Sequence, residues 1–373
     1  MSQRARATVS GARRSIRRTA PARPATEAGS GNQTPSSPVR RINIALQGGG
    51  SHGAFSWGVL DRLLEDGRIE VDGISGTSAG AVNATVLAYG IVSGGREGAR
   101  QMLEALWRGV AECARMSPLQ PTWFDRMLGL DRLNLSPGWL LFDHITRFFS
   151  PYQLNPSNLN PLRDMLVKMI DFDILRNCRS PRLFLCATNV LSGRMRVFTN
   201  HEISIQAVLA SSCLPSLFQA VEIEGEYYWD GGYMGNPPIY PLIYETDSRD
   251  VLIIRINPIR IPDVPTTARE ILDRVNTLSF NSSLMREMRA IEFVSRLIDE
   301  GALDPAQYRR MFIHNIDAET EMARLGVSSK FNADWHFLRE LYTLGRERAD
   351  SWLKANFSAL GTRSSTDIIE TFL

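Results

Sequence analysis

The chain has 373 residues, of which 43% are hydrophobic and 22% charged, with a formal net charge of +2. This length allows one large α/β domain or two smaller ones, and the composition is that of a globular protein. No run of about 18 apolar residues occurs, so the sequence predicts no membrane-spanning helix.

The first part of the chain differs in composition from the rest. Residues 1–41 carry nine arginines and a single acid, Glu27, so the remaining chain is net acidic. Because this segment has few large apolar residues to bury, we expect residues 1–40 to form a disordered, arginine-rich tail. No apolar stretch follows Arg13-Arg14 or Arg17-Arg18, which excludes a twin-arginine export signal. A solvated tail is favoured over an organellar transit peptide, and contact with anionic lipid stays open.

Regular structure is predicted to begin near Arg41. A strand over 42–46 runs into a glycine-rich loop, a helix with apolar residues at helical spacing follows, and a second strand covers 69–74. A further helix is predicted over 79–91. This order of elements indicates parallel strands joined by a right-handed crossover.

Later elements extend the same pattern. Two nearly continuous apolar runs, 183–188 and 251–256, predict strands that are buried on both faces. Between them lie a candidate antiparallel strand over 194–199 and a helix around 203–212, and 312–316 predicts a last strand. The sequence therefore predicts an α/β fold with three layers, α/β/α, a mostly parallel central sheet and a helical C-terminal extension.

The domain organisation follows from these elements. We expect residues 41–260 to form the main domain and 261–373 to form a mostly helical C-terminal region packed on it. An insertion at about 115–161 combines many large apolar side chains with several prolines. A cap over an apolar site and ordinary packing against the sheet explain this insertion equally well.

The segment 71–84, VDGISGTSAGAVNA, places Ser78 between Gly76 and Gly80, after a strand and before a helix. In that position a Gly-x-Ser-x-Gly pattern is typical of a nucleophile elbow, in which a sharp turn displays the serine hydroxyl. The following helix would direct free N–H groups and its positive dipole end toward the serine oxygen. The alternative is a structural turn that only happens to contain serine.

A serine nucleophile needs a base to take its proton. Among the five histidines, His314 and His336 are the candidates for a hydrolase triad, but neither lies in a glycine-bearing turn, so a structural role is favoured for both. Asp230, which ends an aromatic strand and precedes Gly231 and Gly232, is the stronger candidate. On this segment alone, an ordinary Asp-Gly turn is the favoured explanation.

The loop Gly48–Gly53, GGGSHG, joins a strand to a helix. Consecutive glycines there expose backbone N–H groups that can hold an oxyanion or a phosphate. A P-loop is disfavoured because no Gly-Lys-Ser/Thr ending is present, and a dinucleotide fold is disfavoured because a second glycine loop lies where the ribose-binding acid should be.

Taken together, these segments resemble the patatin-like phospholipase family, with a patatin domain of the bacterial type. The resemblance rests on four stretches in this order: GGGSHG at 48–53, GTSAG at 76–80, ASSCLPSLF at 210–218 and DGG at 230–232. It covers about 41–256, and 41–260 would then be the patatin-like catalytic domain.

The resemblance implies a serine lipid acyl hydrolase of phospholipase A or lysophospholipase type, with a Ser–Asp dyad and an acyl-enzyme intermediate. Ser78 would be the nucleophile and Asp230 the general base, and the amides of Gly48, Gly49 and Gly50 would form the oxyanion hole. The motif-supporting residues would be Ser51, His52, Gly53, Gly76, Gly80, Gly231 and Gly232. The family usually has Arg or Lys where this chain has His52, so the charge beside the oxyanion loop is expected to be titratable and to tune activity with pH.

Other readings of the same residues remain open. An esterase acting on acylglycerols, thioesters or a storage polyester would use the same dyad, and a catalytically silent lipid-binding module would use the same pocket. We expect no cofactor and no metal, a lipid or other acyl-ester substrate, and no nucleic acid partner. A cytoplasmic location is expected, with peripheral contact with a membrane surface and the oligomeric state left open.

Overall fold

The computed structural model describes residues 39–114, 144–146, 148–304 and 307–373, apart from the side chains of residues 269 and 327. Of the expected tail over 1–40, only Val39 and Arg40 lie in these ranges. Most of the apolar insertion, residues 115–143 and 147, also lies outside the described residues.

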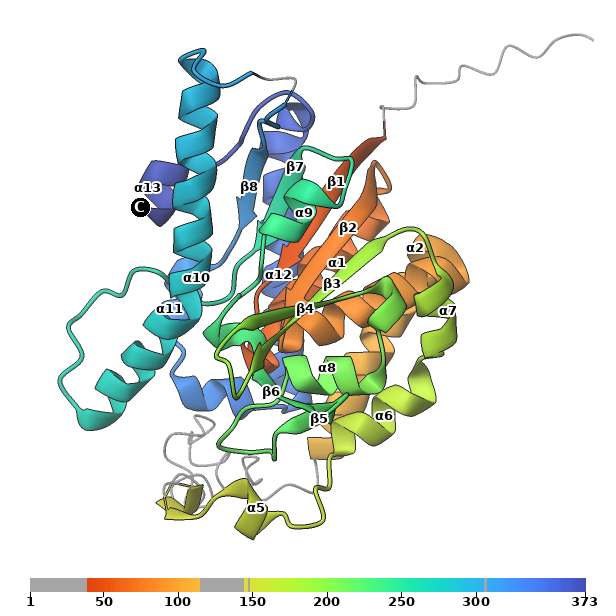
Figure 1. Cartoon of the computed structure of the whole chain (residues 1–373), viewed down its shortest axis with the longest axis vertical. Coiled ribbons are helices and arrows are strands. Elements are labelled where there is room, and N and C mark those ends of the chain that lie inside the picture. The colour runs from red at the N-terminus through yellow and green to blue at the C-terminus, as the bar shows by residue number, and fades with distance from the viewer. Residues whose placement is uncertain (1–38, 115–143, 147, 305–306) are drawn as a thin grey trace, which may run out of the picture. The chain divides into compact units, whose positions relative to one another are not determined.

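Within the described residues, eight strands form one mixed sheet (Figure 1). The path through the sheet is β5-β6-β3-β2-β1-β7-β8, and β4 pairs with β3 beside this path. The strands are β1 (Arg40–Leu46), β2 (Ile69–Thr77), β3 (Arg182–Asn189), β4 (Met195–Thr199), β5 (Val221–Ile223), β6 (Glu226–Asp230), β7 (Asp250–Ile254) and β8 (Phe312–Ile316).

The central strands are parallel, and the strands at one side are antiparallel. Strands β3, β2, β1, β7 and β8 run in the same direction, whereas β4 and β6 are antiparallel to β3, and β5 is antiparallel to β6. The predicted strand over 312–316 is β8, so the sheet continues beyond residue 260.

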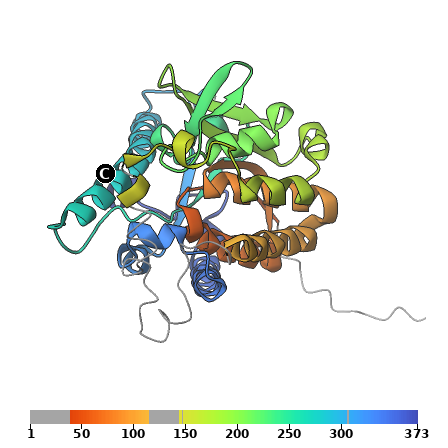
Figure 2. The same cartoon turned by 90° about the horizontal axis from the view of Figure 1, so that it is seen from below.

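Helices flank the sheet (Figures 1 and 2). The described α-helices are α1 (Gly53–Asp66), α2 (Ala79–Ala114), α5 (Pro151–Leu154), α6 (Pro161–Met169), α7 (Phe172–Asn177), α8 (Ile205–Ser211), α9 (Tyr240–Tyr244), α10 (Ala268–Asp299), α11 (Glu319–Ala323), α12 (Trp335–Asn356) and α13 (Ile368–Phe372). The 3-10 helices are η1 (Gly50–His52), η3 (Asn200–Glu202), η4 (Gly231–Tyr233), η5 (Val327–Phe331) and η6 (Phe357–Ala359). Across the described parts of the chain, no helix combines the length and apolar character needed to cross a membrane.

Two apolar cores lie on the two faces of the sheet because successive side chains of a strand point to opposite faces. In β7, Leu252 and Ile254 belong to the core that contains α1, α2 and α12. Val251 and Ile253 of the same strand belong to the core that contains residues of α9, α10 and α13. The prediction of a three-layer α/β fold with a mostly parallel sheet is therefore confirmed.

The helix predicted over 79–91 extends further than expected. It continues to Gly94 and Gly95, where the backbone leaves helical geometry, and a second helix runs on to Ala114. Gly95 has φ of 63°, which favours glycine, so the break falls where the sequence offers glycines. The second helix was not predicted.

Helices α1 and α12 approach each other closely through glycines. A Cβ atom at Gly58 of α1 would lie 2.0 Å from the carbonyl oxygen of Tyr342, and one at Gly345 of α12 would lie 2.1 Å from that of Phe55. Both distances are far below van der Waals contact, so a larger residue at either position would force the helices apart. This contact holds α12, near the end of the chain, directly against the helix that follows the glycine-rich loop.

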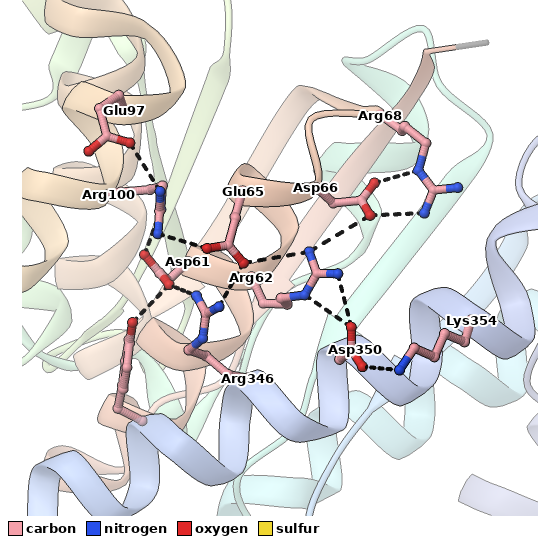
Figure 3. A network of polar contacts seen from close by, with 11 residues as sticks. Asp61, Arg62, Glu65, Asp66, Arg68, Glu97, Arg100, Arg346, Asp350 and Lys354 are labelled. Carbon is pink, nitrogen blue, oxygen red and sulfur yellow. Dashed lines mark hydrogen bonds and ion pairs between the residues drawn. The ribbon is translucent and has the colours of Figure 1, made fainter. Parts of the chain in front are cut away.

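Figure 3 shows an ion-pair network that also joins α1, α2 and α12. Its centre is the buried carboxylate of Asp61 on α1, which accepts hydrogen bonds from Arg100 Nε at 2.9 Å, from the Tyr342 hydroxyl at 2.8 Å and from Arg346. Glu65 receives further bonds from the same two arginines. The network therefore ties three helices to one carboxylate.

Replacing Asp61 with alanine is expected to lower the free energy of unfolding by about 2–3 kcal/mol, because two arginines and a phenol lose their common acceptor. Urea denaturation followed by circular dichroism measures this loss. The matched control is Glu97→Ala, which removes an exposed partner of Arg100 and should change stability by less than about 0.5 kcal/mol. Equal effects of the two substitutions would contradict a central role for Asp61.

Candidate active site

Ser78 lies at a strained turn between β2 and α2. Its φ is 56°, in the left-handed region that a non-glycine residue seldom adopts and that costs about 1–3 kcal/mol. The surrounding chain holds it there, since its N–H donates to both the carbonyl oxygen and the Oγ of Ser211, each at 3.1 Å. The residue is 7% exposed. This geometry matches the sharp strand-to-helix turn that a nucleophile elbow requires, and the role of Ser78 as a nucleophile stays a prediction.

The glycines on either side of Ser78 are required by close backbone contacts. A Cβ atom at Gly76 would lie 2.5 Å from the carbonyl oxygen of Gly80, and one at Gly80 would lie 2.2 Å from that of Leu46. The turn therefore closes on itself and packs against the end of β1. Only glycine fits at the two flanking positions without moving the backbone.

Strand β3 brings Asp230 to the serine. Thr77, the last residue of β2, pairs with Cys186 of β3, and Asp230, the last residue of β6, pairs with Ala187. Both β3 residues also pair with β4, which therefore occupies the opposite edge. It follows that β2 and β6 lie end to end on one edge of β3, and that Ser78 and Asp230 meet where the two strands end.

Asp230 is fully buried and firmly oriented. Its N–H donates to the Cys213 carbonyl at 2.7 Å, and its Oδ1 accepts the Gly232 N–H at 2.7 Å. The other oxygen, Oδ2, has no hydrogen bond of ordinary geometry to the described residues. The Ser78 hydroxyl nevertheless lies close enough to stabilise the carboxylate form. Long or poorly aligned contacts of this kind are common in unliganded active sites.

Burial sets the basicity of Asp230. Loss of water raises the pKa of this carboxyl to about 6, although the Ser78 hydroxyl, the Gly232 N–H and the charge of Lys330 each lower it. At neutral pH the group is therefore ionised, yet it is a stronger base than an aspartate in water. This is the dry environment that a carboxylate base needs.

The two glycines after Asp230 allow the tight packing of this corner. A Cβ atom at Gly231 would lie 2.2 Å from the Cys186 carbonyl oxygen, and one at Gly232 would lie 2.3 Å from the Phe280 ring. The DGG segment is thus wedged between β3 and α10, which fixes the direction of the carboxylate.

The glycine-rich loop lies directly against the serine. A Cβ atom at Gly48 would lie 2.6 Å from Ser78 Cβ. The Gly48 N–H donates to Asn236 Oδ1 at 2.7 Å, whereas the N–H groups of Gly49 and Gly50 make no hydrogen bond with the described residues. The amides of Gly49 and Gly50 therefore keep free donor capacity, whereas that of Gly48, which was expected to join them in an oxyanion hole, is bonded to Asn236.

The other residues of the loop are structural in this arrangement. Ser51 and His52 are buried, and a Cβ atom at Gly53 would lie 3.0 Å from Ala79 Cβ at the start of α2. His52 Nε2 hydrogen-bonds Ser329 Oγ at 2.7 Å. Burial, with the nearby charge of Lys330, lowers the pKa of His52 to about 3, so it is neutral in the physiological range. The expectation that His52 tunes activity by titrating is therefore wrong.

The two histidines that could have completed a triad lie elsewhere. His314 is buried in β8, with Nε2 on Asp250 Oδ1 at 2.9 Å and Nδ1 on Ser365 Oγ at 2.8 Å. Asp250 begins β7, at the opposite end of the parallel strands from Ser78. His336 is exposed in the first turn of α12. The structural role expected for His314 is confirmed.

Several residues that support the loop were not identified from the sequence. Gln47 accepts the N–H groups of Ile256 and Asn257 at 3.0 Å through Oε1. Asn257 Nδ2 donates to the Gly48 carbonyl at 2.7 Å, and Lys330 Nζ donates to Asn257 Oδ1 at 2.7 Å. Asn236 lies shortly after the DGG segment, so its position near the site is visible in the sequence. No feature of the sequence indicates that Lys330 lies near the loop. In the parts of the chain that the structure describes, no three His, Cys, Asp or Glu residues cluster as a metal site would require.

Comparison with known proteins identifies a family for this arrangement. The family model described as patatin-like phospholipase matches residues 44–243, which include the elbow, the glycine-rich loop and the DGG segment. Among solved structures, the chain is similar to VipD from Legionella pneumophila, with 17% sequence identity over 85% of this chain and 68% of that chain, and a TM-score of 0.36. A TM-score this low carries no argument here. A search of the curated proteins gave no match.

Proposed function

The chain belongs to the patatin-like phospholipase family, and from that premise we propose that it is a serine lipid acyl hydrolase of phospholipase A or lysophospholipase type. The observation that carries the proposal is the meeting of Ser78 and Asp230 at the edge of β3, beside the glycine-rich loop. A strained serine turn, a buried carboxylate and free amides are the three parts that acyl transfer needs.

The first half of the proposed reaction acylates the serine. Ser78 Oγ attacks the ester carbonyl carbon while its proton passes to Asp230. The amides of Gly49 and Gly50 hold the negative oxygen of the tetrahedral intermediate, and each good donor is worth about 3–4 kcal/mol. The bond to the leaving alcohol then breaks, and Asp230 returns the proton to that alcohol.

The second half releases the acyl group. A water molecule attacks the acyl-serine carbonyl and gives its proton to Asp230. The second tetrahedral intermediate collapses with loss of Ser78 Oγ, which recovers the proton, and a fatty acid leaves. Neither half of the reaction oxidises or reduces any group, and Ser78 and Asp230 return to their starting protonation states.

Apolar side chains near the site support a lipid substrate. Phe148, Phe149, Tyr152 and Leu154 are all exposed, and they lie within the apolar insertion at about 115–161, for which a cap over an apolar site was one of two expectations. The Tyr152 hydroxyl accepts the Ala220 N–H at 3.2 Å, just before β5. Because β5 pairs with β6, this bond holds the segment close to the strand that ends at Asp230. Trp139 and Leu140, two of the large apolar residues of this insertion, lie outside the described residues.

The test is to incubate the protein with vesicles of mixed phospholipids and to identify the products by mass spectrometry. We expect free fatty acid together with the matching lysophospholipid. Release of acid only from acylglycerols, thioesters or polyester would contradict a phospholipase and favour the alternative esterase. Vesicle binding without any acyl product would support the silent lipid-binding module instead.

A further inference from the structure

A lysine from the C-terminal region lies against the glycine-rich loop. The backbone of Lys330, in η5, approaches so closely that a Cβ atom at Gly50 would lie 2.3 Å from its carbonyl oxygen. Its Nζ donates to Asn257 Oδ1 at 2.7 Å, and Asn257 Nδ2 donates to the Gly48 carbonyl at 2.7 Å. One side-chain relay therefore connects the ammonium group to the loop. Lys330 lies outside the residues that the family model matches.

Two carboxylates and an aromatic ring lie around the Lys330 ammonium group. Asp230 on β6 and Asp273 on α10 both attract it, and the Phe280 ring of α10 has its centroid 5.8 Å from Nζ. His52, the nearest titratable group on η1, is neutral for the reason given above. His52 thus contributes no charge to the glycine-rich loop, while Lys330 reaches the same loop from a distant segment of the chain.

We propose that Lys330 is a positioning residue of the active site: through Asn257 it fixes the glycine-rich loop, and its charge favours the anionic forms of Asp230 and of the tetrahedral intermediate. The inference rests on the proposed acyl hydrolase function. A charge placed in a partly dry site acts strongly on nearby anions because little water screens it.

The ionisation of both groups defines a pH window. Burial lowers the pKa of Lys330 to about 8, against the attraction of Asp273 and Asp230. The base must be deprotonated, so kcat/KM rises with pH through about 6. The lysine must be protonated, so kcat/KM falls with pH above about 8. The structure therefore predicts a bell-shaped profile with both limbs set inside the site.

The experiment compares kcat/KM from acid to alkaline pH, with a short soluble ester, for the wild type, Lys330→Met, Lys330→Arg and the control Lys354→Met. Lys354 is an exposed lysine of α12 paired with Asp350. In Lys330→Met we expect the alkaline limb to disappear, the acid limb to move to higher pH, and kcat/KM at neutral pH to fall about tenfold. Lys330→Arg should keep most of the activity and lose the alkaline limb, because arginine stays protonated. Lys354→Met should match the wild type.

Two outcomes separate this inference from the proposed function. If the wild type hydrolyses esters and the profiles of both Lys330 variants match that of Lys354→Met, the role of Lys330 is overturned and the hydrolase stands. If the wild type is inactive, the proposed function fails, and NMR titration of the Asp230 carboxyl carbon still decides the electrostatic part. A higher Asp230 pKa in Lys330→Met supports that part, and an unchanged pKa refutes it.

Discussion

Ser78→Ala is expected to abolish covalent labelling by a fluorophosphonate probe and to reduce ester hydrolysis by at least about 10⁴-fold. The reason is that the probe and the substrate are both expected to react with the same Ser78 oxygen. Labelling followed by gel fluorescence, with hydrolysis of a soluble ester measured alongside, gives both readouts. The alanine should fit without strain beyond that already present at this φ.

The matched control is Ser358→Ala, at an exposed serine of η6. This variant should label and hydrolyse like the wild type. Persistent labelling of Ser78→Ala would place the reactive group elsewhere and remove the basis for the mechanism. A wild-type protein that does not label at all would favour the lipid-binding module.

Asp230→Asn is expected to reduce kcat by about 10³–10⁴-fold with little loss of stability. An asparagine can still accept the Gly232 N–H through its carbonyl oxygen, so the corner should keep its shape. It cannot accept the serine proton, however, and the nucleophile then has no base. Steady-state kinetics on a soluble ester measures the loss, and a thermal melt shows whether the fold is retained.

The comparison variants are His314→Ala and His336→Ala. Both should keep most of the activity, since His314 is bonded to Asp250 and Ser365 away from the elbow and His336 is exposed on α12. Because His314 is buried, its variant is compared only at temperatures where its circular dichroism matches that of the wild type. Loss of activity in either folded histidine variant would contradict the Ser–Asp dyad and favour a triad that contains that histidine.

Local patterns in the sequence predicted most of the fold. The strand over 312–316 has the bounds predicted for it, and a helix follows the glycine-rich loop as predicted. These predictions succeed because apolar runs and helical spacing are properties of neighbouring residues. The second helix of α2 and the short strand β5 were missed, since neither has a local signal strong enough to stand alone.

The candidate site was only partly predictable for a different reason. Ser78 and Asp230 each stand in a recognisable motif, so the sequence indicated both. Lys330 and Asn257 reach the glycine-rich loop only through contacts between residues far apart in the chain. The predicted role of His52 failed for the same reason: its neutral state depends on burial and on Lys330, and neither is visible in a short motif.

The end-to-end arrangement of β2 and β6 on β3 has a consequence for how this chain can diverge. Strand β3 sets the distance between Ser78 and Asp230, and the long connection from β2 to β3, which contains the apolar insertion, does not. That connection can lengthen, shorten or change composition while the pairing of β2 and β6 with β3 is kept. Substrate preference can therefore change through substitutions in this connection while Ser78 and Asp230 keep their geometry. A shift of β2 or β6 by one residue along β3 would instead separate the two side chains.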